Sequence, residues 1–353
     1  MDWEKLLLNL RILADGGTVD SLPLQEFLLS HGCNYLAGRI PHKREYYAAF
    51  CRNILLVKQS HKCIIPVLTE LSVCKYAMIK GAVLSQQIYG TPFGRKSSDI
   101  DILIHPNDLD LVRYTLEKNN FVQGKVIDGE LLPCTRGEKI FYNTQSHQTA
   151  PFVKKNDNEF IPFVSVDINY SLFWGEKRQC CDMDFVLSQT EPAELLGVSI
   201  MKLSPEMEFI ALCLHHYKDM NSPLMIAEGK VKLSLFSDIF FYIKNGSLDI
   251  FKVYRLAEEM GVIPYIFYCV WYTNILFSSD ILVPYLKQFS SDEGYSLLTK
   301  YGLTESERKE WTYPFRYRLL SSTFKNVFYS SLDEDTKRQV DINRYYIVNP
   351  TKY

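Results

Sequence analysis

The chain has 353 residues, of which 47% are apolar and 23% are charged. This is ordinary for a globular protein and long enough for one large domain or two smaller ones. The formal net charge of −2 argues against a protein that coats nucleic acid and against strong binding to an anionic membrane.

The nine cysteines have irregular spacing and include no Cys-x-x-Cys pair, which argues against a disulfide framework and a structural zinc site. The first residues lack a basic stretch followed by a long apolar run. No run of about eighteen uncharged apolar residues follows. We therefore expect a soluble protein of the reducing cytoplasm, with no membrane partner.

The first part of the chain, residues 1–74, is predicted to be a helical region. Apolar residues recur at helical spacing after Trp3, and Gly16 and Gly17 end this first helix. A second helix is expected over 22–38, and a third, longer one over 42–73, which Pro66 would kink or break.

Residues 75–190 are predicted to form a small α/β core. Apolar residues at 76–79 indicate a short strand, and a helix over 82–89 follows it. A strand begins at Asp99 and a helix follows at 106–119. Further strands are expected at 121–122, 139–142, 152–153 and 163–168.

Helical periodicity returns in the last part of the chain, residues 191–353. The expected helices are 205–216, 231–243, 248–260 and 264–277. The turn residues between 188 and 204 mark the boundary. The predicted fold class is therefore α+β, with a small mixed β-sheet core flanked in the chain by helical regions.

The most informative motif is Asp99-Ile100-Asp101, followed by three more apolar residues. In a strand this alternation puts both carboxylates on one face, roughly 7 Å apart. Such carboxylates repel each other unless cations lie between them. The alternative is a solvated strand entry, since Ser and Asp also favour turns.

Two further pieces fit metal-assisted phosphoryl transfer. Asp167 lies between apolar neighbours in a predicted core strand, where a carboxylate without a partner or a metal is costly. Lys80-Gly81-Ala82 lies at a predicted strand-to-helix turn, where free N–H groups favour phosphate. Ligands that are all oxygen favour Mg²⁺ or Mn²⁺.

These residues resemble the signature of the DNA polymerase β-type nucleotidyltransferases, and more narrowly a bacterial branch of uncharacterised nucleotidyltransferases, some encoded beside natural-product pathways. The resemblance spans roughly residues 40–245. It is carried by Lys80-Gly81-Ala82, Tyr89-Gly90, Arg95, Ser98-Asp99-Ile100-Asp101 and Asp167-Ile168-Asn169-Tyr170. Two departures stand out: Ala82 replaces the usual Ser or Gly, and Asn169-Tyr170 replaces the usual His-Trp.

The resemblance implies a polymerase β-like core that transfers a nucleoside monophosphate from an NTP, with ATP as the first candidate. Asp99 and Asp101 would bind both metals, and Asp167 would bind the catalytic metal and orient or deprotonate the acceptor. The residues implied in nucleotide binding are Lys80, Gly81, Ala82, Arg95 and Ser98.

A later stretch supplies weaker candidates, His215, His216 and Lys218, for contact with nucleotide or acceptor. Local packing on their helix is the favoured alternative for the histidines. The expected acceptor is a small molecule or a peptide natural product. The acidic balance disfavours nucleic acid, and the alternatives are a tRNA- or protein-modifying enzyme of the toxin or defence type and a binding module whose catalysis has decayed.

Overall fold

The chain folds into two compact units, each formed by two separate stretches of sequence. The helical unit comprises residues 1–47 and 209–345, and the sheet unit comprises residues 48–208 and 346–353. The computed structural model describes residues 2–41, 43–174 and 182–347. The predicted N-terminal region is shared between the units, because one continuous helix, α4 (Lys43–Glu70), passes from one to the other.

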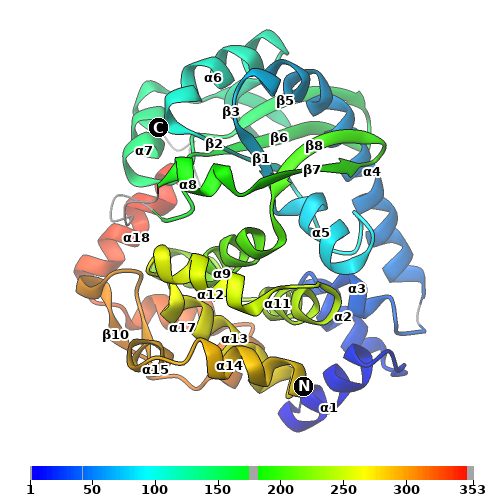
Figure 1. Ribbon diagram of the computed structural model, residues 1–353, viewed down its shortest axis with the longest axis vertical. Coiled ribbons are helices and arrows are strands. Elements are labelled where there is room, and N and C mark those ends of the chain that lie inside the picture. The colour runs from blue at the N-terminus through cyan, green and yellow to red at the C-terminus, as the bar shows by residue number, and fades with distance from the viewer. Residues whose placement is uncertain (1, 42, 175–181, 348–353) are drawn as a thin grey trace. The chain divides into compact units, whose positions relative to one another are not determined.

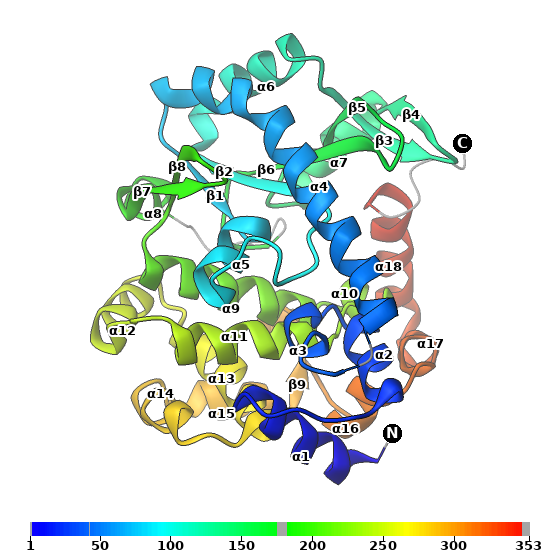
Figure 2. The ribbon, with the colours of Figure 1, turned by 90° about the vertical axis from the view of Figure 1, so that its right-hand side faces the viewer.

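Among the described residues, the sheet unit is built on eight strands, in the spatial order β4-β3-β5-β6-β2-β1-β8-β7. Figure 1 shows this sheet, and β4 is labelled in Figure 2. The strands are β1 (Tyr76–Ile79), β2 (Ile100–Ile104), β3 (Val122–Ile127), β4 (Glu130–Pro133), β5 (Phe152–Asn158), β6 (Ile161–Asn169), β7 (Thr190–Leu195) and β8 (Val198–Leu203). Strand β2 pairs antiparallel with β1 and parallel with β6. The predicted fold class, a mixed sheet flanked in the chain by helical regions, is confirmed.

Along the central strands, side chains alternate between the two faces of the sheet. Ile100, Ile102 and Ile104 of β2 belong to the hydrophobic core, together with the alternate residues Val164, Val166 and Ile168 of β6. Helix α6 (Leu109–Lys118) and the C-terminal part of α4 pack on this face, and α5 (Gly81–Tyr89) lies on the opposite side (Figure 2). Because side chains alternate, Asp101 and Asp167 point away from the α4–α6 face.

The helical unit is dominated by helices that bury aromatic side chains. Most of α13 (Ile263–Phe277) and α11 (Leu233–Asn245) is buried. The other helices in this unit are α1 (Trp3–Ala14), α2 (Leu22–Ser30), α3 (Asn34–Ala37), the C-terminal part of α9 (Pro205–Asn221), α10 (Pro223–Ala227), α12 (Ile250–Glu259), α14 (Val283–Gln288), α15 (Asp292–Leu298), α16 (Phe315–Leu320), α17 (Phe324–Ser331) and α18 (Glu334–Ile347). The helices predicted after residue 204 are therefore confirmed.

One predicted strand, at 139–142, is wrong, because these residues lie in helix α7 (Arg136–Gln145). Its start is fixed by a capping box: Thr135 accepts a hydrogen bond from the backbone N–H of Glu138, and the Glu138 carboxylate accepts one from the backbone N–H of Thr135. These reciprocal bonds satisfy donors that would otherwise be unpaired at the helix start. The capping outweighs the β propensity of the apolar residues within the segment.

The residues interpreted as a boundary, 188–204, contain the hairpin of β7 and β8. Its two-residue turn is Leu196-Gly197, with φ of 50° and 79°, the left-handed backbone that such tight hairpins require. The helix predicted over 22–38 is divided after α2, where Gly32 has φ of 74°. Pro66 lies inside α4 without ending it. Helix α8 (Met183–Ser188) precedes the hairpin.

Among the described residues, no helix combines the length and apolar character that crossing a bilayer requires.

A buried amide on α4 fixes the loop that leads into β2. Asn53 is 4% exposed, and its Nδ2 donates to the carbonyls of Phe93 and Arg95 at 3.0 and 2.8 Å. Its Oδ1 accepts from the backbone N–H of Ser97 at 3.0 Å. One side chain therefore satisfies three backbone groups of the loop before Asp99.

We expect Asn53→Leu to destabilise the protein by on the order of 3 kcal/mol, because buried backbone groups that lose a partner cost about 1–3 kcal/mol each. Chemical denaturation followed by circular dichroism measures this change. The control is Arg52→Leu at the exposed neighbouring position on α4. Equal stability of the two variants would contradict the assignment.

Candidate active site

The turn between β1 and α5 has unusual backbone geometry. Lys80 has φ of 56° and ψ of −150°, and Gly81, the first residue of α5, has φ of 45°. A side chain is strained at such a φ, and a Cβ on Gly81 would lie 3.2 Å from Ser97 Oγ. Because glycine has no Cβ, residue 81 places no side chain over the backbone N–H groups at the start of α5. Ala82 follows in the first turn of α5.

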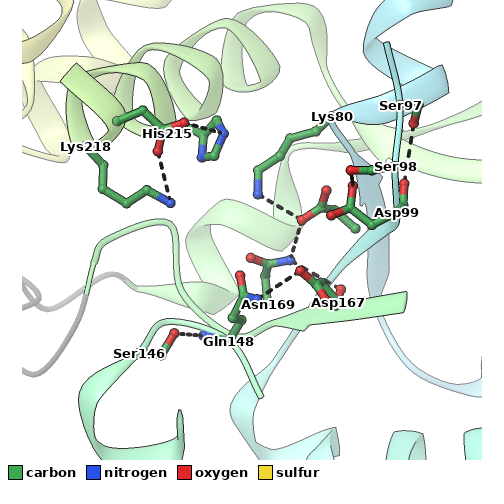
Figure 3. Close-up of polar contacts among 12 residues, drawn as sticks. Lys80, Ser97, Ser98, Asp99, Ser146, Gln148, Asp167, Asn169, His215 and Lys218 are labelled. Carbon is green, nitrogen blue, oxygen red and sulfur yellow. Dashed lines mark hydrogen bonds and ion pairs between the residues drawn. The ribbon is translucent and has the colours of Figure 1, made fainter. Parts of the chain in front are cut away.

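The pairing of β2 and β6 brings two of the predicted carboxylates together. The strands run parallel, and Asp101 is the register partner of Asp167. Adjacent strands lie about 4.8 Å apart, so two side chains on the same face at paired positions are neighbours. Asp99 lies immediately before β2, and Figure 3 shows it near Asp167 and Lys80. The structure thus gathers the three aspartates beside the α5 turn.

Each carboxylate has its own donors (Figure 3). Asp101 is 7% exposed; its Oδ1 accepts from Lys80 Nζ at 2.9 Å and from Asn169 Nδ2 at 3.1 Å. Asp167 Oδ2 accepts from Gln148 Nε2 at 2.9 Å. Ser98 Oγ donates to Asp99 Oδ1 at 3.1 Å.

Three carboxyl groups and one ammonium influence one another's ionisation in this cluster. Burial and the repulsion of Asp99 and Asp101 raise the pKa of Asp167 well above its usual value. Burial and Asp101 likewise raise the pKa of Asp99. Burial opposes the charge on Lys80, but attraction to Asp101, and then to Asp99 and Asp167, outweighs it and raises the Lys80 pKa. Three carboxylates surrounding one ammonium would gain from a further cation.

The donor chemistry of the cluster fits a hard divalent cation, since carboxylate oxygens are its usual protein ligands. Within the described ranges, no three His, Cys, Asp or Glu side chains are already gathered as a complete metal-binding group. The residues that would hold the cation are Asp99, Asp101 and Asp167. The observation that supports this fit is the placement of Asp101 beside Asp167, with Asp99 nearby and one ammonium among them.

The other nucleotide-binding candidates of the sheet unit lie near this cluster. Ser98 bonds to Asp99, and the positive charge of Arg95 lowers the pKa of Asp99 against the larger effects that raise it. The Arg95 backbone is fixed by Ser85 and Asn53. Lys80 contacts Asp101, and its predicted role on phosphate stays a prediction.

The three weaker candidates belong to the helical unit, on α9. His216 is fully buried, with Nε2 3.6 Å from Asp238 Oδ2. His215 and Lys218 both approach Asp219, at 3.6 Å each. Local pairing on and around α9 is therefore what the structure describes for these side chains, and their contact with a substrate stays a prediction.

Sequence reasoning missed two polar residues of the cluster. Gln148 lies between α7 and β5, where no motif marks it. Asn169 stands out in the sequence only because it replaces the histidine that is usual at this position in the family that the chain resembles. The one signal for Asn169 was its position two residues after Asp167, which places it on the same face of β6.

A mixed sheet with clustered carboxylates beside a glycine-marked helix start is the arrangement expected of a nucleotidyltransferase. The sequence matches the family described as "uncharacterised nucleotidyltransferase" over residues 39–278, which is more than half of the chain, and the chain therefore belongs to that family. The narrower bacterial branch stays a prediction.

Among solved structures, the chain is similar to an antigenic nucleotidyltransferase-like protein from Paracoccidioides brasiliensis. The two are 16% identical, with a TM-score of 0.32, and the match covers 59% of this chain and 88% of that chain. No curated protein matches the chain.

Without divalent cations, in EDTA, we expect Asp167→Asn to be more stable than the wild type at pH 8. A raised folded-state pKa means that the folded protein binds the Asp167 proton more tightly than the unfolded chain does. Stability is then lost as pH rises above the unfolded pKa of about 3.9. Asparagine at position 167 cannot ionise, so the variant avoids this loss of stability. Its stability advantage over the wild type should therefore shrink toward pH 4.

Melting temperatures from pH 4 to 8 measure this effect, and we expect an increase of roughly a few degrees at pH 8. Asp157→Asn, at an exposed position on β5, is the matched control. A melting temperature of Asp167→Asn below that of the wild type at pH 8 would contradict the electrostatic account.

Proposed function

We propose that the protein is a divalent-cation-dependent nucleotidyltransferase that moves a nucleoside monophosphate from an NTP, with ATP as the first candidate, to a hydroxyl or phosphate of a small molecule or peptide. The observation that carries the proposal is the in-register pairing of Asp101 with Asp167, next to Asp99 and the α5 turn. Membership of the family supports the nucleotidyl-transfer class.

In the proposed reaction, an acceptor oxygen attacks the α-phosphorus of the NTP and a new P–O bond forms. The bond between the α-phosphorus and the bridging α–β oxygen breaks, and pyrophosphate leaves with that electron pair. When bound, Mg²⁺ or Mn²⁺ would offset the negative charge of the triphosphate. The acceptor proton goes to the Asp167 carboxylate, which acts as general base.

The remaining roles follow from charge and position. Backbone N–H groups of Gly81 and Ala82 at the start of α5 would donate to phosphate oxygens. Lys80 and Arg95 would offset phosphate charge, and the planar guanidinium of Arg95 suits bidentate contact. Ser98 would hold Asp99 in place through its hydroxyl.

The assay incubates the protein with Mg²⁺ and each of the four α-labelled NTPs, together with a small-molecule extract, total RNA or a protein extract. Labelled product and released pyrophosphate in the small-molecule arm would support the proposal. Label in RNA or protein would instead assign the alternative acceptor classes. Tight NTP binding with no turnover in any arm, unchanged by Asp101→Asn, would identify a binding module.

We expect Asp99→Asn and Asp101→Asn each to lower the turnover number by about 10³-fold or more, since loss of a charged ligand removes several kcal/mol of transition-state stabilisation. Pyrophosphate release measures the rate, and circular dichroism checks that the variants remain folded. Asp157→Asn at the exposed β5 position should retain the wild-type rate. Near-normal turnover of both active-site variants would refute the assigned roles.

A further inference from the structure

A short segment before β5 pairs with the end of β6. Gln148 and Asn169 form an isolated antiparallel bridge. The backbone N–H of Thr149 donates to Ile168 O at 2.9 Å, and that of Tyr170 donates to His147 O at 3.0 Å. The two carboxamide residues are thus held opposite each other by backbone bonds that do not involve their side chains.

The two side chains reach different carboxylates. Asn169, 1% exposed, donates from Nδ2 to Asp101 Oδ1 at 3.1 Å and to the backbone carbonyl of Asp167 at 3.3 Å. Gln148 donates from Nε2 to Asp167 Oδ2 at 2.9 Å. Each carboxamide contacts one oxygen of its aspartate, and the described contacts leave the second oxygen of each aspartate without a carboxamide donor.

Hydrogen bonds also fix the position of the segment that contains Gln148. Tyr170 Oη donates to Ser146 O at 2.8 Å and lies 3.3 Å from the carbonyls of Tyr142 and Asn143 at the end of α7. The backbone N–H of Gln148 donates to Ser146 Oγ at 3.3 Å. Donors held on a fixed backbone can orient a carboxylate at little further entropic cost.

We propose that Asn169 and Gln148 are positioning residues that hold Asp101 and Asp167 ready for a divalent cation, an inference that rests on the proposed function. A carboxamide suits this task because it is a neutral donor. It fixes the direction of the carboxylate but leaves its negative charge available to the cation. An ammonium competes with the cation for that charge, as that of Lys80 does at Asp101 Oδ1. Side chains that hydrogen-bond to metal ligands in this way are typically worth about 10–100-fold in metal affinity or activity.

The test measures Mn²⁺ binding to the metal-free full-length protein, without nucleotide, from the free-Mn²⁺ signal in electron paramagnetic resonance. Leucine has nearly the shape of asparagine and cannot donate. We therefore expect Asn169→Leu to raise the Mn²⁺ dissociation constant by about 10–100-fold. Gln148→Leu should weaken binding similarly, and it acts at a less buried position if Asn169→Leu fails to fold.

Two further variants separate positioning from packing. Asn169→His restores a ring N–H at a similar distance from the backbone, and it should recover most of the Mn²⁺ affinity. Asn156→Leu removes an amide that donates to Ile161 O in the β5–β6 hairpin, and it should bind Mn²⁺ as the wild type does. Melting temperatures of the metal-free variants report loss of packing independently.

The outcomes distinguish this inference from the proposed function. If the wild type binds no Mn²⁺ at millimolar concentrations, both are overturned. If the wild type binds Mn²⁺, Asp101→Asn does not, and both leucine variants bind as the wild type does, only the positioning inference is overturned. Weakened binding that follows a lowered melting temperature, with no recovery in Asn169→His, would also overturn it by indicating a packing role.

Discussion

The parallel pairing of β2 with β6 is the constraint on which the candidate site depends. It sets Asp101 directly beside Asp167, although 66 positions of chain separate them. Because side chains alternate, a slip of one residue would turn one of these carboxylates to the face packed by α4 and α6. The isoleucines of β2 and the aliphatic residues of β6 on that face make such a slip costly, since it would bury charge and expose apolar surface. The hydrophobic core thereby fixes the geometry of the polar site on the other face.

The local part of this arrangement was predictable. Alternation at 99–104 indicated a strand, and Lys80-Gly81 indicated the turn into α5; both elements are present, although β2 begins at Ile100, so that Asp99 precedes it. The partner strand and its register were not predictable in the same way, because they depend on packing between distant segments. Local signals also misled: the apolar run within α7 suggested a strand, but the segment is a helix that begins at a capping box. Gln148 carried no signal at all, since its contact with Asp167 exists only after the bridge to Asn169 has formed.

The cluster is electrostatically costly for the fold that holds it. Burial and mutual repulsion raise the pKa values of Asp99 and Asp167, so ionised carboxylates here reduce stability at neutral pH. A fold keeps such a group only when the surrounding structure compensates. Here the compensation comes from Lys80, from neutral amide donors and from the apolar face opposite. Concentrated repulsion of this kind is common at sites where charge serves binding or catalysis.

Lys80 connects the electrostatics to the backbone. It has an unfavourable positive φ at the start of α5, yet its ammonium reaches Asp101 from the adjacent turn. The ammonium has three N–H donors, so one lysine can contact both Asp101 and a phosphate oxygen. A lysine can contact a carboxylate and a phosphate together more readily than an arginine can, because its compact charge lies on a flexible stem without a fixed planar geometry. The Asn169 amide donates to the same Asp101 oxygen as Lys80 does, so the orientation of this carboxylate does not depend on the lysine alone.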